Sequence, residues 1–146
     1  MESRIGQRVQ FDELEIWRSI SRSWKTLNRD VENALSPTGL SLAEVKILRF
    51  LHEDGPLPIT KLTTELLVTP GAVTSLVDGL ESQALVERVR SESDRRVVTI
   101  KITTNGEATI KKAIFLHKQY LTKKFQSLSK KDALYLSELL YRLANA

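Results

Sequence analysis

The sequence contains no cysteine, and this absence excludes several kinds of site at once. Without thiols the chain forms no disulfide, binds no cysteine-ligated zinc or iron–sulfur cluster, and has no thiol redox switch. Histidine is scarce, because only His52 and His117 occur, and neither belongs to a metal-binding His-Glu-x-x-His pattern. Solvated or packed histidines are the simpler interpretation. We therefore expect no metal site and no bound cofactor.

Long apolar runs and catalytic patterns are missing as well. No apolar run reaches the roughly 18 residues that a membrane-spanning helix needs. The first residues, MESRIGQRVQFDELEIW, lack the apolar core of a secretory signal, so we expect a cytoplasmic protein that does not enter a membrane. The acidic residues are scattered, and no Ser/His/Asp set, metal cluster or glycine-rich phosphate loop stands at a telling spacing. We expect no enzymatic activity.

What is present is typical of a single globular domain. A chain of 146 residues is long enough to bury a substantial core, and 41% hydrophobic and 27% charged residues are ordinary for a soluble protein. The formal net charge is +4, from 22 Lys and Arg against 18 Asp and Glu. This excess permits nucleic-acid binding but does not demonstrate it. Most acids lie before residue 88, whereas residues 88–131 carry a basic surplus.

The hydrophobic periodicity predicts helices along most of the chain. The first carries two neighbouring apolar stripes, which implies burial on two sides. Ser41 and Glu44 form a capping box at the start of the second, and Thr69 and Pro70 stand at the N-cap and N1 positions of the fourth. Helices are expected over about 12–35, 42–52, 59–67, 69–83 and 105–126, with a final helix after Ser129.

Beyond residue 84 the apolar pattern changes from the helical period to the alternation of strands. Leu85–Arg90 and Val97–Ile102 are predicted to be two strands, joined by the six residues Ser91–Arg96. This connection is longer than a tight hairpin turn needs, so its tip can project from the fold. The predicted fold class is mainly α with a small β-ribbon.

The helix over 69–83 has one buried face and one slim polar face. Val73, Leu76, Val77 and Leu80 recur at helical spacing and predict the buried stripe. The opposite face is small, polar and nearly uncharged, which allows close approach to the major groove, where hydroxyls bond to bases and a methyl group contacts thymine. An ordinary solvated face is the alternative. The candidate DNA-binding residues on this face are Thr69, Gly71, Ala72, Thr74 and Ser75, with Asp78 beside them.

Four arginines lie within nine residues of the predicted ribbon. Arg95 and Arg96 stand near its tip and suit the enhanced negative potential of a narrow minor groove. Arg88 and Arg90 point to one face of a strand, from which they can reach phosphates. Asp94 is expected to brace the tip by accepting hydrogen bonds from Arg96 or from turn amides. The alternative is a hairpin edge that charge keeps soluble.

Helix, short turn, helix and two-stranded ribbon is the order of a winged helix-turn-helix. Within it, LVERVRSESDRRVVTIKITTNG resembles the wing of the MarR family of transcriptional regulators, and TPGAVTSLVDGLE is similar to the family's recognition helix. The family's wing has a Leu-Val strand ending in Arg, an Asp-Arg-Arg tip, a second strand and Leu-Thr-x-x-Gly. The resemblance covers nearly the whole chain, including both long flanking helices. The matching residues are Leu85, Val86, Arg88, Asp94, Arg95, Arg96, Thr103 and Gly106, with Ile102 in place of Leu.

Besides Ile102, three residues depart from the family pattern. Ala84 stands where members usually have the glycine that follows the recognition helix. A left-handed backbone there costs an alanine about 1 kcal/mol, so we expect a slightly different helix exit. Ser75 and Gly79 stand where basic residues are frequent. This predicts fewer phosphate contacts from the helix and a larger share from the wing.

The resemblance implies a single MarR-type domain over residues 1–146 and an obligate homodimer. It implies that residues 10–36 and 105–146 form the dimerisation helices, that 41–104 form the winged-helix DNA-binding lobe, and that 59–83 form the helix-turn-helix. A two-fold dimer places two recognition helices about one helical turn apart on a pseudo-palindromic operator in double-stranded DNA. A repressor is the favoured form of regulation.

Many members of the family bind a small phenolic or anionic ligand between the dimer helices and the DNA-binding lobe. The resemblance implies that Trp17, Arg18, Arg22 and Trp24 line such a pocket, because tryptophan offers aromatic surface and guanidinium groups bind carboxylates. Core packing is the simpler role for both tryptophans. The lack of cysteine excludes sensing by thiol oxidation. The alternative function for the whole chain is a winged-helix module that binds protein through its ribbon and does not bind DNA.

Overall fold

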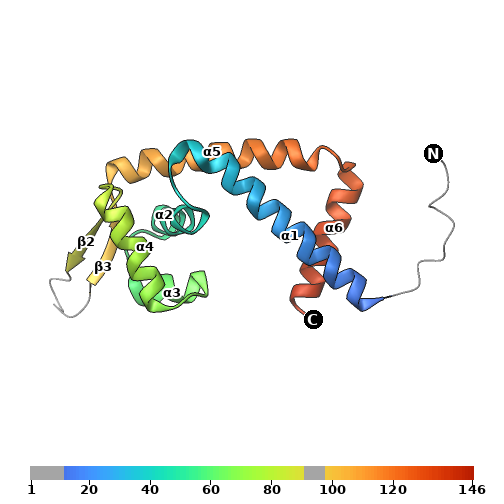
Figure 1. Ribbon diagram of the computed structural model, residues 1–146, viewed down its shortest axis with the longest axis horizontal. Helices are drawn as coiled ribbons and strands as arrows, with labels where there is room; N and C mark the ends of the chain where they lie inside the picture. The colour runs from blue at the N-terminus through green and yellow to red at the C-terminus, as the bar shows by residue number, and fades with distance from the viewer. Residues whose placement is uncertain (1–11, 91–97) are drawn as a thin grey trace. The chain divides into compact units, whose positions relative to one another are not determined.

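The computed structural model describes residues 12–90 and 98–146 (Figure 1). This part of the chain is mainly helical and carries a small antiparallel sheet, which confirms the predicted fold class. The chain divides into two compact units, Met1–Asp30 and Val31–Ala146. The elements are α1 (Glu13–Leu35), a short 3-10 helix η1 (Ser36–Thr38), α2 (Leu42–Asp54), β1 (Leu57–Pro58), α3 (Ile59–Leu66), α4 (Pro70–Ser82), β2 (Val86–Arg90), β3 (Val98–Ile102), α5 (Thr104–Phe125) and α6 (Lys130–Ala144).

Local capping explains where most of the helices begin. At α2 the Ser41 hydroxyl accepts a hydrogen bond from the Glu44 amide at 3.3 Å, and the Glu44 carboxylate accepts one from the Ser41 amide at 2.8 Å, which confirms the capping box. Such bonds satisfy amides that have no partner within the helix. At α4, α5 and α6 the hydroxyls of Thr69, Thr103 and Ser129 accept from the amides of Ala72, Gly106 and Asp132.

The core of the Val31–Ala146 unit is built around α2, which contacts α3, α4 and α5 (Figure 1). In α4 the predicted stripe is confirmed at Val73, Val77 and Leu80, which are fully buried. Leu76 is only partly buried and packs against the edge of the core. Burial of each large aliphatic side chain contributes about 1.5–3 kcal/mol. The apolar stripe therefore holds α4 to the lobe and leaves its opposite face on the surface.

The sheet has three strands in the order β1-β3-β2, all antiparallel. β2 and β3 pair from Val86 opposite Ile102 to Arg90 opposite Val98, as the predicted ribbon requires. The sequence did not predict β1, which pairs Leu57 with Ile100. β1 is only two residues long and includes Pro58, and proline is tolerated in a strand only at an edge because it cannot donate a ladder hydrogen bond.

Two non-glycine residues of the described chain have a left-handed backbone, and they lie on either side of α4. Leu67 (φ 54°, ψ 41°) follows α3, and Ala84 (φ 56°) follows α4. Each conformation costs a residue with a Cβ atom about 1 kcal/mol. The expectation of a different helix exit at Ala84 is therefore wrong, because the left-handed backbone is retained. Its carbonyl is held by the Thr103 hydroxyl, which donates to it at 2.7 Å.

Gly106, in the first turn of α5, lies directly against the segment that joins α4 to β2. A Cβ atom at Gly106 would clash with the carbonyl oxygen of Leu85 and lie 2.6 Å from Cγ1 of Ile102, so only glycine fits without displacing these groups. The same Leu85 carbonyl accepts a hydrogen bond from the Thr103 amide at 3.0 Å. The start of α5 is thereby fixed to the exit from α4.

Large hydrophobic side chains remain exposed on α1, α5 and α6. Trp17 and Trp24 of α1 are 66% and 61% exposed, and Phe115 of α5 is 60% exposed. α6 has no buried residue, although it carries five leucines and two tyrosines. These faces are uncovered in a single chain. None of the described helices is both long and apolar enough to cross a membrane.

Candidate nucleic-acid interface

The polar face of α4 lies on the surface, as the sequence predicted. Thr69, Gly71, Ala72, Thr74 and Ser75 are all exposed, while the apolar stripe on the other side of the helix is buried. No charged residue occurs between Glu65 and Asp78. The first two turns of α4 therefore present a slim, uncharged surface that can approach base edges closely.

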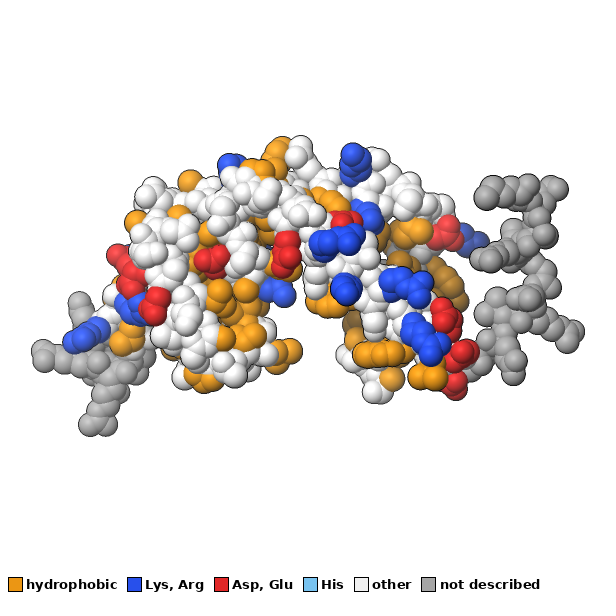
Figure 2. All heavy atoms as spheres, viewed as in Figure 1, with side chains coloured by type: hydrophobic (Ala, Val, Ile, Leu, Met, Phe, Trp, Pro, Cys, Tyr) orange, Lys and Arg blue, Asp and Glu red, His pale blue; other side chains and the backbone are white. Residues whose placement is uncertain are grey.

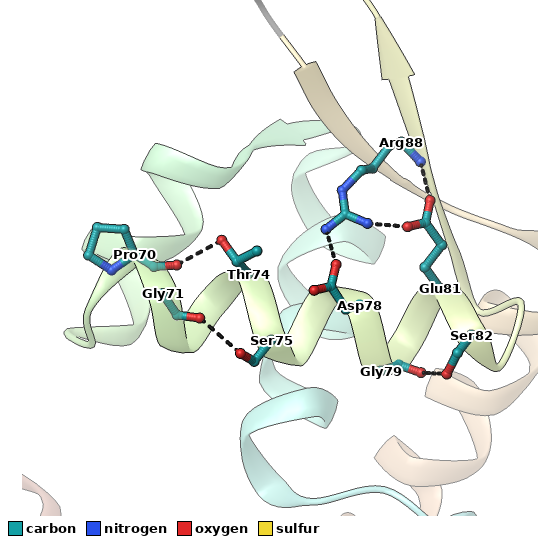
Figure 3. A network of polar contacts seen from close by, with 9 residues as sticks. All are labelled: Pro70, Gly71, Thr74, Ser75, Asp78, Gly79, Glu81, Ser82 and Arg88. Atoms are coloured by element: carbon teal, nitrogen blue, oxygen red, sulfur yellow. Dashed lines mark hydrogen bonds and ion pairs between the residues drawn. The ribbon is translucent and has the colours of Figure 1, made fainter.

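The two hydroxyls in the middle of this face are oriented by the helix backbone. Thr74 Oγ1 donates to the Pro70 carbonyl at 2.9 Å, and Ser75 Oγ donates to the Gly71 carbonyl at 3.1 Å (Figure 3). A hydroxyl whose proton is used in this way still has lone pairs that accept hydrogen bonds. In this arrangement both side chains fit the exposed amino groups of adenine or cytosine better than base acceptors.

Arg88 connects β2 to the last two turns of α4 (Figure 3). Its Nη2 atom lies 2.5 Å from Oδ1 of Asp78, and its Nη1 atom donates to Oε2 of Glu81. The backbone amide of Arg88 also donates to Oε1 of Glu81, at 3.3 Å. The hydrogen bond to Asp78 is the main cause that raises the pKa of Arg88 above its ordinary value, although burial opposes the shift. One guanidinium thus balances two carboxylates of α4.

The pairing of Arg88 gives it a role that its sequence context did not predict. Arg88 was expected to reach phosphates, and that contact stays a prediction, because three of its five N–H groups take no part in these two ion pairs. Asp78 and Glu81 were not assigned a function. Their spacing of three residues on one helix, which places both side chains on the same face, was the available signal.

The comparisons with known proteins agree with this geometry. The sequence model of the MarR family matches residues 40–98, which run from the turn before α2 to the start of β3. The regulator MhqR of Bacillus subtilis is 26% identical over 130 residues, which cover 89% of this chain and 90% of MhqR. This chain belongs to the MarR family.

Solved structures of MarR-family proteins have the same fold. AbsC, a MarR family transcriptional regulator from Streptomyces coelicolor, is 26% identical with a TM-score of 0.80, over 95% of this chain and 97% of AbsC. A cysteine-to-serine variant of MarR from Escherichia coli, complexed with operator DNA, is 26% identical with a TM-score of 0.79, over 88% of this chain and 93% of that one. The segments that the sequence predicted to be the recognition helix and the wing of this family form α4 and the strands β2 and β3.

The described part of the MarR-type wing includes two of the four predicted arginines. Arg90 is exposed at the end of β2, opposite Val98. Arg95 and Arg96, predicted to bind DNA, and Asp94, predicted to brace the tip, lie outside the described residues.

The four residues predicted to bind a ligand lie on α1. Trp17 and Trp24 are largely exposed, so neither is a core residue of the single chain. Arg18 Nη1 lies 3.7 Å from Oε2 of Glu15, in an exposed pair that contributes little to stability. Arg22 lies on the same helix. Neither of the two hollows described in the Val31–Ala146 unit is lined by these four residues.

One of these hollows, of about 400 Å³, lies between α2 and α5. Its lining combines apolar side chains such as Val45 and Leu121 with His117 and with the charged side chains of Lys46, Arg49, Lys118 and Glu53. Nε of Arg49 is buried and has no hydrogen-bond partner among the described residues, and it lies 4.0 Å from Oε1 of Glu53 in an ion pair. Burial lowers the pKa of His117, and the nearby charge of Arg49 lowers it further. Three basic side chains against one carboxylate leave a partly apolar lining of net positive charge, which suits a small organic anion.

Proposed function

We propose that the protein is a dimeric, sequence-specific regulator of transcription that binds double-stranded DNA and acts as a repressor. The observation that carries this proposal is the exposed, uncharged face of α4, held beside the wing by the ion pairs of Arg88. A recognition helix needs a face that fits the major groove and a support that fixes its angle. A MarR-family relative of the same fold is solved with operator DNA.

The proposed binding mode assigns the two elements to different grooves. The N-terminal turns of α4 enter the major groove, where Thr74 and Ser75 contact bases. Free amides at the start of α4 favour a nearby phosphate, through their partial positive charge. The wing follows the backbone with Arg90 and, at its tip, contacts the minor groove with Arg95 and Arg96. Repression follows where such a complex covers a promoter.

The active form in this proposal is a homodimer. The support is the apolar surface that the single chain leaves uncovered on α1, α5 and α6, including Trp17, Trp24 and Tyr141. Obligate dimers bury large hydrophobic interfaces, and a second copy supplies the burial that the two apolar stripes of α1 need. A two-fold axis then sets two recognition helices against a pseudo-palindromic operator. Sedimentation at micromolar concentration tests the stoichiometry.

A small phenolic or anionic ligand that relieves repression is part of the proposal, with Trp17, Arg18, Arg22 and Trp24 as its residues. The hollow beside Arg49 is the alternative location, since its lining also fits an organic anion. Thermal melting in the presence of sodium benzoate, compared among wild type, Arg18→Gln and Arg49→Gln, distinguishes the two. The variant that loses the ligand-induced rise in melting temperature identifies the site. A rise that persists in both variants contradicts both locations.

The function includes no catalytic step, and a regulator that works on chromosomal DNA acts in the cytoplasm. The test of the function is a salt titration of binding to random duplex DNA. Each phosphate contact contributes about −0.9 to the slope of log K against log salt, so a steep slope is expected. Repeated selection from random duplexes should then recover a palindrome. A flat salt response supports the protein-binding alternative instead.

A further inference from the structure

The exposed hydrophobic residues of the described chain fall into two groups. Most lie on α1, α5 and α6, where a second copy of the chain covers them in the proposed dimer. Between α1 and α5 only Leu67, Val68 and Val89 are large, hydrophobic and exposed among the described residues. Figure 2 shows hydrophobic side chains on the surface over α3 and α4. Leu67 and Val68 are consecutive and form what we call the apolar ledge.

Leu67 has no evident structural reason to be a leucine. It is 90% exposed, more than any other large hydrophobic residue in the described ranges, so its side chain gains almost nothing from packing within the chain. Its backbone is left-handed, a conformation in which glycine is free of strain and leucine is not. A strained backbone that carries an unpacked side chain is a reason to look for a contact outside the protein.

The ledge is continuous with the DNA-binding face of α4. Val68 directly precedes Thr69, the N-cap of α4, and the exposed surface runs on through Pro70, Gly71 and Ala72. Because this stretch has no charged side chain, its contact at the groove edge is not an ion pair with phosphate. The apolar group that the major groove offers is the 5-methyl group of thymine.

We propose that Leu67 and Val68 contact thymine methyl groups at the edge of each half-site and so select thymine there. This inference rests on the proposed DNA-binding function and adds a specificity element to it. A protein partner is the other candidate occupant. Two side chains are far too few for a protein interface, which buries roughly 800 Å² on each partner, whereas one or two methyl groups match the ledge in size.

The decisive probe is an operator duplex in which single thymines are replaced by deoxyuridine, since this removes only the methyl group. The operator is the palindrome selected by the wild-type protein. Replacement of a contacted thymine should lower the affinity of the wild-type protein for the operator about fourfold, which corresponds to the loss of one buried methyl or methylene group. Leu67→Gly should bind both duplexes equally where the replaced thymine is the one that Leu67 contacts, and should still discriminate at a thymine that Val68 contacts. It removes the side chain and relieves the strain at Leu67, so it is expected to fold.

Ala84→Gly is the matched control, because it relieves the backbone strain at the other left-handed position beside α4 and leaves the apolar ledge intact. It should discriminate thymine from deoxyuridine as wild type does. The inference is overturned if wild type binds all the duplexes equally, or if Leu67→Gly keeps the wild-type discrimination at every thymine. Those results leave salt-dependent DNA binding in place and so refute only the ledge contact. If wild type shows no salt-dependent duplex binding at all, the proposed function itself fails.

Discussion

Nη2 of Arg88 lies 2.5 Å from Oδ1 of Asp78, so β2, the first strand of the predicted wing, is ion-paired to the outer face of α4. With Glu81 as the second partner, Arg88 also balances two negative charges that would repel DNA phosphates in the proposed complex. An arginine in a DNA-binding wing is usually interpreted as a phosphate contact. Here its first contribution is to the protein's own geometry and charge.

Replacement of Arg88 should therefore weaken DNA binding by more than the loss of one phosphate contact. Arg88→Ala leaves two unbalanced carboxylates near the duplex, and a drop in affinity on the order of tenfold is expected from their repulsion. The measurement is the dissociation constant by fluorescence anisotropy at fixed salt. Combining Arg88→Ala with Asp78→Asn and Glu81→Gln should recover part of the loss. If the combined variant recovers nothing and the salt slope falls by about 0.9, Arg88 acts only as a phosphate contact.

The two left-handed residues beside α4 should be sites where glycine stabilises the protein. Ala84→Gly and Leu67→Gly should each raise the free energy of unfolding by about 1 kcal/mol, because they remove the Cβ repulsion. Gly39→Ala is the control in the reverse direction. Gly39 has φ +73° and no atom lies within 4 Å of an added Cβ, so the substitution adds backbone strain without a clash and should lower the free energy of unfolding by a similar amount. Urea unfolding followed by circular dichroism, at one protein concentration, gives all three values. Lower stability of Ala84→Gly contradicts the account.

Thr74 and Ser75 should determine part of the sequence preference. Their hydroxyl protons are bound to helix carbonyls, so the oxygens are placed to accept from adenine or cytosine amino groups. Thr74→Ala or Ser75→Ala should change the sequences recovered by selection from random duplexes. Each variant should melt within a few degrees of wild type, since both side chains are exposed. An unchanged preference removes the substituted residue from the base-reading set.

His117 should make the protein less stable in mild acid. Because burial and Arg49 lower its pKa in the fold, the unfolded chain binds more protons than the folded chain as the pH falls below about 6.5. The free energy of unfolding should thus decrease as the pH drops through the interval between the ordinary pKa and the folded-state pKa. His117→Gln should remove this contribution. Urea unfolding between pH 8 and pH 5 tests it. Parallel curves for wild type and variant contradict the assignment.

Most of the helical fold could be predicted because its signals are local. Ser41 and Thr69 form their caps with amides three residues away, and the apolar stripe of α4 follows helical spacing. β1 could not be predicted, since Leu57 pairs with Ile100 and nothing near Leu57 encodes that partner. The left-handed turn at Ala84 was missed for a related reason: its cost is offset by a hydrogen bond from Thr103, distant in sequence.

The candidate site also has features that local sequence patterns predict and contacts that they do not. Exposure of the polar face of α4 follows from its periodicity, so the sequence predicted it correctly. The partners of Arg88 lie seven and ten residues away in another element, and only the packing of β2 against α4 brings them together. Side-chain pairing between elements depends on that packing, which local patterns do not contain.

The close approach of Gly106 to Leu85 has a mechanical consequence. The start of α5 contacts the exit from α4 through the Leu85 carbonyl, and the Thr103 hydroxyl donates a hydrogen bond to the Ala84 carbonyl beside it. No flexible segment therefore separates the two helices at this contact. A rotation of α5 about this junction is therefore passed directly to α4, the proposed recognition helix. Whatever alters the angle between the two α5 helices of a dimer also alters the distance between its two DNA-reading ends.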